Sequence, residues 1–370
     1  MNNQTQQLPS IFNRVADQQF DVMDQLLEHA KQDMIGSKEK AVETNTIEFA
    51  EMGNSIGIAL TDENTGEIPN PYALTHYSMM QACRMAKLDT DVVRRLQFHG
   101  RNDLAIDNLN TLFPNATGDF KIMLLDPNKR IRALNGQDYS RLWDFTMFNE
   151  VNKCLIPAGF VPAVIRKGCG ALLRAGATAL FRGDQTSFGF FFTDDIQTYD
   201  DQLGGLRQGI MIWNSEVGAR SFGFSTFYFR EQSGTFLIWD RKSEVRKRFV
   251  HRGDITRGFR EYLSVIRDAA KNAGGSRQED LTTFNTAANT PFASNFDEAV
   301  EKLNKLFDMP KAQAEAVVRA SLLPENASGA EFSVWRISLG ISWEAAQTSR
   351  AESMVDEGAA ASKVIRRMVK

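Results

Sequence analysis

Cysteine and histidine are both scarce in this chain of 370 residues, which contains three of the first and four of the second. Cys83, Cys154 and Cys169 stand far apart and form no CxxC pair, so we expect reduced thiols in a reducing compartment rather than a disulfide framework. No two histidines have the HxxxH or HExxH spacing with which a helix binds zinc. The sequence therefore predicts neither a metal site nor a cofactor.

Long apolar runs are missing as well. No window approaches the roughly 20 apolar residues needed to cross a bilayer. The first residues, MNNQTQQ, are polar and lack the basic start and apolar core of a signal peptide. We therefore expect a cytoplasmic protein without a membrane partner. The net charge is only −3, so any attraction to nucleic acid must come from a local patch.

The patterns of apolar residues predict an α+β fold, with a mixed or antiparallel sheet core, inserted helices and a helical C-terminal region. Strand-like segments separated by turn formers dominate residues 160–240. A segment rich in Thr, Ser and Asn predicts a linker, and the Ala-rich tail after position 356 is expected to fray. The predicted divisions are an N-terminal helical arm (1–44), a core domain (45–275), the linker (276–296) and a helical region (297–370).

One apolar strand, beginning at Gly209, ends in the polar run Asn214-Ser215-Glu216 and then Gly218. Short polar side chains commonly bond loose backbone groups at such bends, and glycine supplies unusual φ angles. The alternative is that Asn214 and Glu216 face a cleft. A metal-dependent hydrolase would need Glu216 to converge with Asp194 and Asp240, because hard cations bind clustered carboxylates.

Aromatic residues alternate along the next strand, which puts Phe222, Phe224 and Tyr228 on one face. Aromatic side chains on an open sheet can stack on the bases of single strands. They are equally typical of a packed core. Both interpretations remain open at this point.

A basic segment follows, in which residues 241–260 contain eight Arg or Lys against two acids, a net charge of +6. Such asymmetry favours an anionic partner and a salt-dependent affinity, although a solvated helix face is the alternative. Arg130 and Arg132, two apart on an earlier strand, share a face and could hold a phosphate. The candidate phosphate contacts are Arg130, Arg132, Arg246, Lys247, Arg248 and Arg252.

Taken in order, several of these segments resemble domain-of-unknown-function family 932, which phages and plasmids encode. The resemblance covers about residues 45–265. Where the family has a Cys and an Asn-Gly after the aromatic strand, this chain has Glu231-Gln-Ser-Gly234. The matching segments are Asn70–Met85, Leu104–Asn110, Lys121–Tyr139, Gly209–Gly218 (with Asn214, Ser215, Glu216 and Gly218) and His251–Gly253. The resemblance implies a mobile-element setting and an α+β core, but no defined reaction.

The sequence thus favours a non-enzymatic, DNA-associated accessory protein of a phage or plasmid, in replication, recombination or single-strand handling. Two alternatives stay open: a metal-dependent hydrolase of nucleic acid, and a structural or assembly protein. For the second alternative, the C-terminal helices would pack against further copies of the chain.

Overall fold

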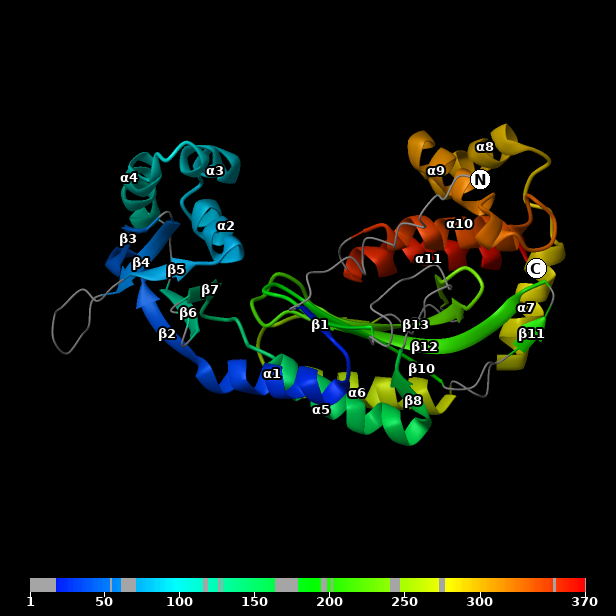
Figure 1. The fold of residues 1–370 in the computed structure, drawn as a ribbon, viewed down its shortest axis with the longest axis horizontal. Helices are drawn as coiled ribbons and strands as arrows, with labels where there is room; N and C mark the ends of the chain where they lie inside the picture. Colours follow the sequence, from blue (N-terminus) through cyan, green and yellow to red (C-terminus); the bar gives the residue numbers. More distant parts are fainter. Residues whose placement is uncertain are drawn as a thin grey trace.

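The fold of this protein is α+β, as predicted, and it is built on two separate sheets (Figure 1). The computed structural model describes residues 18–53, 55–60, 71–115, 119–125, 128, 130–163, 179–193, 198–200, 202–239, 247–272, 277–348 and 351–369. Within these parts of the chain, no helix combines the length and the apolar character needed to cross a bilayer.

The larger sheet has nine described strands, all paired antiparallel, along the path β1-β9-β10-β12-β13-β14. Strands β8, β11 and β15 pair with β10, β12 and β13 off this path. The bounds are β1 Gln19–Phe20, β8 Phe160–Pro162, β9 Leu180–Arg182, β10 Ser187–Thr193, β11 Thr198–Asp200, β12 Gly204–Asn214, β13 Phe222–Arg230, β14 Thr235–Ile238 and β15 Lys247–Phe249.

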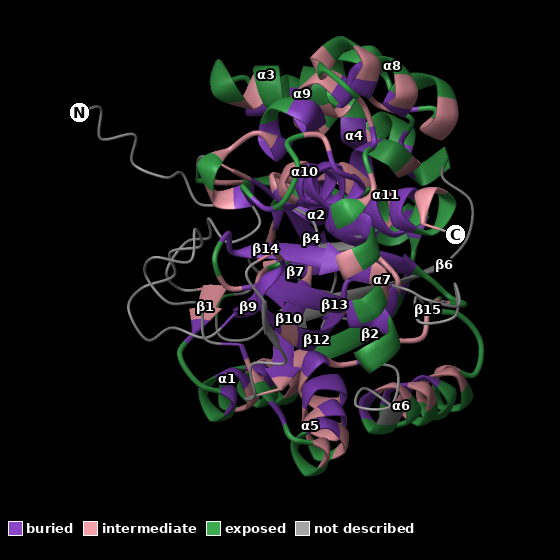
Figure 2. Ribbon diagram, turned by 90° about the vertical axis from the view of Figure 1, so that its right-hand side faces the viewer, coloured by how far each residue is buried: buried purple, intermediate pink, exposed green. Residues whose placement is uncertain are grey.

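Both faces of this sheet are covered by helices, so its strands are buried between two helical layers (Figure 2). Ile210 and Ile212 of β12 pack toward the first layer, while Met211 and Trp213 pack toward the second, as the two-residue period of a strand requires. The first layer is α1 (Met23–Gly36), α5 (Asp144–Leu155) and α6 (Ile255–Asn272). The second is α7 (Arg277–Asn289), α10 (Val334–Ala346) and α11 (Ala351–Met368), with α9 (Lys311–Ser321) on α10 and α8 (Phe296–Phe307) on α9.

The second sheet lies in a unit inserted between α1 and α5, here called the inserted unit (residues 37–136) (Figure 1). Its strand order is β2-β6-β7-β5-β4-β3, and only the β5/β7 pair is parallel among the described strands. Helices α2, α3 and α4 cover one face. The bounds are β2 Ser37–Glu43, β3 Ile47–Met52, β4 Ser55–Leu60, β5 Tyr72–Leu74, α2 His76–Met85, α3 Thr90–Phe98, α4 Asn102–Leu112, β6 Asp119–Leu125 and β7 Arg130–Gly136. Short 3₁₀ turns occupy Thr44–Thr46, Phe113–Asn115, Ile156–Ala158 and Pro324–Asn326.

Three expectations about the organisation of the chain differ from the described structure. The expected linker contains helix α7, whose Leu281 and Phe284 are buried against the large sheet. The expected fraying tail is the second half of α11, where Val364 and Ile365 are fully buried. Among the described residues of the N-terminal arm, α1 is followed by an edge strand, because residues 37–43 pair with β6. In each case a partner distant in sequence decided the outcome.

Candidate functional site

The bend after β12 packs into the junction between the two sheets. Asn214 donates to the carbonyl of Leu142 (2.9 Å) and to Asp144 Oδ1 (2.8 Å). The Ser215 hydroxyl donates to the carbonyl of Gln185 (2.5 Å) and accepts from the amide of Ala219 (2.9 Å). These contacts fix the bend from both sides.

Gly218 has a left-handed φ of +77°, as the bend prediction required. A Cβ atom on this residue would come within 2.7 Å of the Tyr139 ring, so a side chain is excluded by space as well as by backbone conformation. The Tyr139 hydroxyl donates to the carbonyls of Ser215 (3.1 Å) and Glu216 (2.9 Å). The glycine therefore allows the loop after β7 to lock onto the bend.

Glu216 is the centre of a buried ion-pair cluster. Its carboxylate accepts from Arg132 Nη1 (2.8 Å), Arg182 Nη2 (3.1 Å) and the amide of Asp144 (2.8 Å). Glu216 is only 2% exposed, Arg132 is 3% exposed and Arg182 is 4% exposed. Arg132 comes from β7 of the inserted unit and Arg182 from β9 of the large sheet, so one carboxylate links the two sheets.

Arg182 extends the cluster to α1 and α5. Its Nε donates to Asp144 Oδ2 (3.1 Å), and its Nη1 pairs with Asp33 and lies 3.0 Å from His29 Nδ1. Ser187 also donates to Asp144 Oδ2 (2.6 Å). Charges this deeply buried are tolerated only when they are paired and hydrogen-bonded, which is the arrangement seen here.

The two buried carboxyls have opposite pKa shifts. Burial alone would raise the pKa of Glu216, but Arg182 and Arg132 outweigh it and hold this pKa below its ordinary value. Burial, reinforced by the neighbouring Glu216, raises the pKa of Asp144 to about 6. A carboxyl with a pKa near 6 has the proton affinity of a general acid. Asp144 is 1% exposed, however, and both its oxygens already have partners within the protein, so no substrate reaches it.

The cluster therefore functions as a structural joint between the sheets. Among the described residues, no three His, Cys, Asp or Glu side chains converge as metal ligands. Asp194 and Asp240, which the hydrolase alternative needs beside Glu216, lie outside the described residues. Both carboxylate oxygens of Glu216 already have partners, since Oε2 accepts from Arg132 and Arg182 and Oε1 accepts from the amide of Asp144, so neither is left for a metal.

Helices cover all three aromatic residues that were predicted to stack on bases, α6 of the first layer covering Phe222 and Phe224 and α7 of the second layer covering Tyr228, so the prediction of one open aromatic face was wrong. Phe222 and Phe224 are 0% exposed and pack against Tyr262 of α6 at ring-centroid distances of 5.3 and 5.8 Å. Tyr228 is 1% exposed, packs edge-on to Phe284 of α7, and donates its hydroxyl to Asp280 (2.9 Å). No base can stack on these rings while the helices cover them.

The structure separates the predicted phosphate contacts. Arg130 and Arg132 do point the same way, since both contact Asp184, but Arg132 is buried in the cluster and cannot meet a phosphate. Arg130 is 37% exposed and lies 3.9 Å from the Asp184 carboxylate. Lys247 and Arg248 belong to β15 with no described side chains, and Arg246 lies outside the described residues. Arg252 is exposed immediately before α6.

Helix α6 carries a basic surface. The basic segment identified in the sequence, residues 241–260, includes only the first half of it. Four exposed cations lie on this helix: Arg257, Arg260, Arg267 and Lys271. At 3.6 residues per turn, their positions fall within an arc of about 80° and span about 21 Å of the helix. Glu261 and Asp268 border this arc on one side only. We call these four cations together with Arg252 the α6 stripe. A helical projection of residues 255–272 could have found the second half of it.

Sequence reasoning also missed Arg182, Asp144 and Asp33 as partners of Glu216. Each lies in an otherwise unremarkable segment, and no local pattern shows that their side chains meet.

Comparison with known protein families, with curated proteins and with solved structures gave no match to this chain. The family resemblance therefore stays a prediction.

Proposed function

We propose that this protein is a non-enzymatic, nucleic-acid-associated protein that contacts the phosphate backbone through the α6 stripe. The observation that carries the proposal is the alignment of four exposed cations along one side of α6 in a chain whose net charge is −3. Backbone phosphates present a regular row of negative charge, and a row of Arg and Lys complements it. A setting in the bacterial cytoplasm, on a phage or plasmid, agrees with this role.

The proposal places the contact on a helix rather than on the sheet. The α6 cations lie on the outer side of this helix, since its inner side packs Tyr262 and Ile266 into the core. Their charged ends are exposed, where a phosphate can reach them, and Arg267 Nη2 also lies 3.8 Å from Cys154 Sγ of α5. Contacts of this kind position a nucleic acid without reading its sequence.

A salt titration tests the proposal. Fluorescence anisotropy would follow binding to a labelled single strand and to a duplex of DNA between about 50 and 200 mM salt. If three cations contact phosphates of a duplex, the variant Arg257→Ala/Arg260→Ala/Arg267→Ala should reduce the slope of log K against log salt by about 2 to 3. The control is Lys311→Ala/Arg319→Ala, which removes two exposed cations from α9.

Two results would overturn the proposal. One is a wild-type protein that binds neither form of DNA at the lowest salt. The other is a triple variant whose affinity and salt slope equal those of the α9 control. Circular dichroism of each variant confirms that the exposed substitutions leave the fold intact.

A further inference from the structure

Helices α2 and α3 of the inserted unit are joined by a tight, well-defined turn. Lys87 has a left-handed φ of +54°, its amide bonds the carbonyl of Arg84 (3.2 Å), and the amide of Leu88 bonds the carbonyl of Cys83 (2.8 Å). This pair of bonds is the Schellman ending of a helix. Asp89 then caps α3 by accepting from the amide of Asp91 (2.7 Å). Four residues therefore connect the two helices, as in helix-turn-helix units.

The inner sides of these helices hold the pair together. Ala82 and Cys83 of α2 and Val93 of α3 are buried, and Leu88 of the turn and Leu96 of α3 pack partly buried against the same core. Helix α3 packs on α2 and α4. It lies at the outer end of the inserted unit, away from the strands (Figure 1). One helix of the pair is thus anchored on the sheet side and the other is presented to solvent.

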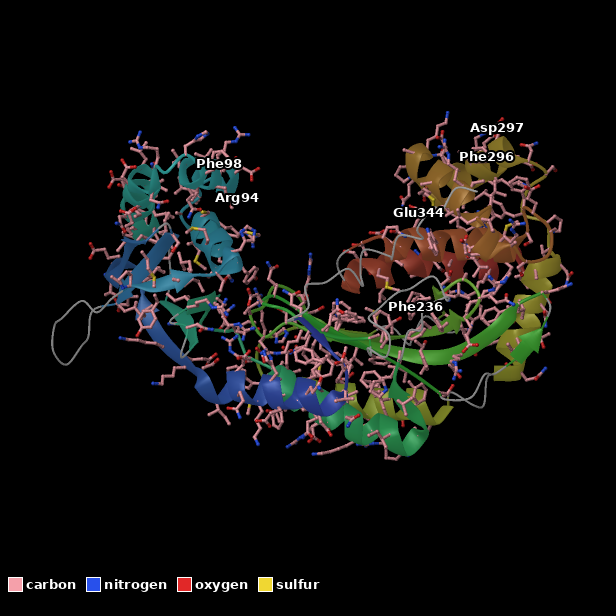
Figure 3. All side chains as sticks on the ribbon, viewed as in Figure 1. Arg94, Phe98, Phe236, Phe296, Asp297 and Glu344 are labelled. Carbon is pink, nitrogen blue, oxygen red and sulfur yellow. The ribbon has the colours of Figure 1, made fainter. Side chains whose placement is uncertain are left out.

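The exposed side of α3 combines charged and apolar side chains. Arg94 is 61% exposed, Phe98 is 85% exposed and Val92 is 52% exposed, and Figure 3 shows Arg94 and Phe98 on α3. Arg95 and Asp91 are exposed on the same side, and Asp91 Oδ1 lies 3.6 Å from Arg94 Nη1 in a solvent-exposed ion pair. At 3.6 residues per turn the five side chains occupy an arc of about 160°, with Phe98 and Asp91 between the two arginines. Phe98 therefore lies outside the core of this unit, and together with Val92 and the flanking arginines it presents both apolar and cationic groups to a partner.

We infer that α3 is a recognition helix that enters the major groove of double-stranded DNA. A helix of about 10–12 Å in diameter fits a groove of about 12 Å. The side chains on this face match base edges: arginine bonds guanine, a carboxylate accepts from cytosine, and Phe or Val contacts the thymine methyl group. Residues 84–99 contain four Arg or Lys against two Asp, a net +2, which suits a polyanion.

Duplex DNA fits this surface better than other nucleic acids. The major groove of A-form RNA is too narrow and deep for a helix, and single strands have no groove. The inference rests on the proposed function in requiring DNA binding, but it concerns a different helix and a different property. The α6 stripe would supply affinity from phosphates, whereas α3 would supply sequence preference from bases.

Selection from a random-sequence duplex library separates the two. The wild-type protein should enrich a sequence motif, and the α6 triple variant should enrich the same motif with lower affinity. Arg94→Ala/Arg95→Ala should lose the motif, with at least a tenfold weaker preference for the selected duplex over a scrambled one. Arg95→Gln, which keeps the helix propensity, should relax the motif at one position. Thermal melting would verify that these exposed substitutions leave the fold intact, and the α9 double variant is the control.

Three outcomes overturn the inference. If the wild-type protein binds DNA with a strong salt dependence but enriches no motif, α3 is not a recognition helix while the proposed function stands. If Arg94→Ala/Arg95→Ala enriches the same motif as the wild type, the bases are read elsewhere. If binding to DNA is absent altogether, both proposals fail.

Discussion

Replacing Glu216 by Gln is the most direct test of the joint between the two sheets. The substitution keeps the volume of the side chain and removes one buried negative charge. Its main consequence falls on Arg132, which is 3% exposed and has no other carboxylate partner among its contacts in the described residues. The remaining bond from its guanidinium, to the carbonyl of Asp184, is long at 3.4 Å. Arg182 is less affected, because it keeps Asp144 and Asp33.

The expected loss of unfolding free energy is about 3 kcal/mol, near the lower end of what breaking a buried ion pair costs. The matched control is Glu301→Gln, which breaks an exposed pair with Lys305 on α8 and should cost under about 0.5 kcal/mol. Urea unfolding followed by circular dichroism and tryptophan fluorescence gives both values, with unchanged m-values as the check on two-state behaviour.

A double-mutant cycle identifies the cause of the loss. If the orphaned guanidinium is responsible, adding Arg132→Met to Glu216→Gln should cost at least about 1 kcal/mol less than the two single losses together. Additive losses would refute the reasoning. A Glu216→Gln variant as stable as Glu301→Gln would also refute it, because the buried carboxylate would then contribute no more to stability than an exposed one.

The remaining predictions concern pH, backbone conformation and packing. Burial raises the folded-state pKa of Asp144 from 3.8 to about 6, so its contribution to stability is present below pH 3.8 and lost as pH rises through 6. Relative to Asp144→Asn, the wild type should lose stability over this window by an amount on the order of 3 kcal/mol, and parallel pH curves from urea titrations would contradict this. Gly218→Ala should lower the free energy of unfolding by about 1–3 kcal/mol, because alanine is strained at this φ and its Cβ would contact Tyr139. Thermal melting measures the loss, and an unchanged Tm would show that neither effect operates. Phe284→Ala should cost about 3–5 kcal/mol, against under about 0.5 for the exposed Phe98→Ala, and equal losses would show that α7 is not part of the core.

Much of the fold could be predicted because its signals are local. Strand-like segments were expected across residues 160–240, where β8 to β14 lie, and helices were expected in the C-terminal region, where α8 to α11 lie. The bend at Gly218 was predicted from residue chemistry alone. The helix α7 was missed because its polar composition resembles a linker, and only its contact with the large sheet shows that Phe284 is a core residue.

The candidate surfaces likewise depend partly on local sequence and partly on long-range contacts. The sequence by itself determined the α+β alternation, the bend after β12 and the positive charge around α6, because each depends on residues close together in the chain. Only the tertiary structure decided which charges face water. Glu216 meets Arg132 across 84 positions, Asp144 across 72 and Arg182 across 34, and no local pattern records such distances. Burial is a property of these long-range contacts, which is why Arg132 and the aromatic rings of β13 proved to be interior and the stripe on α6 proved to be surface.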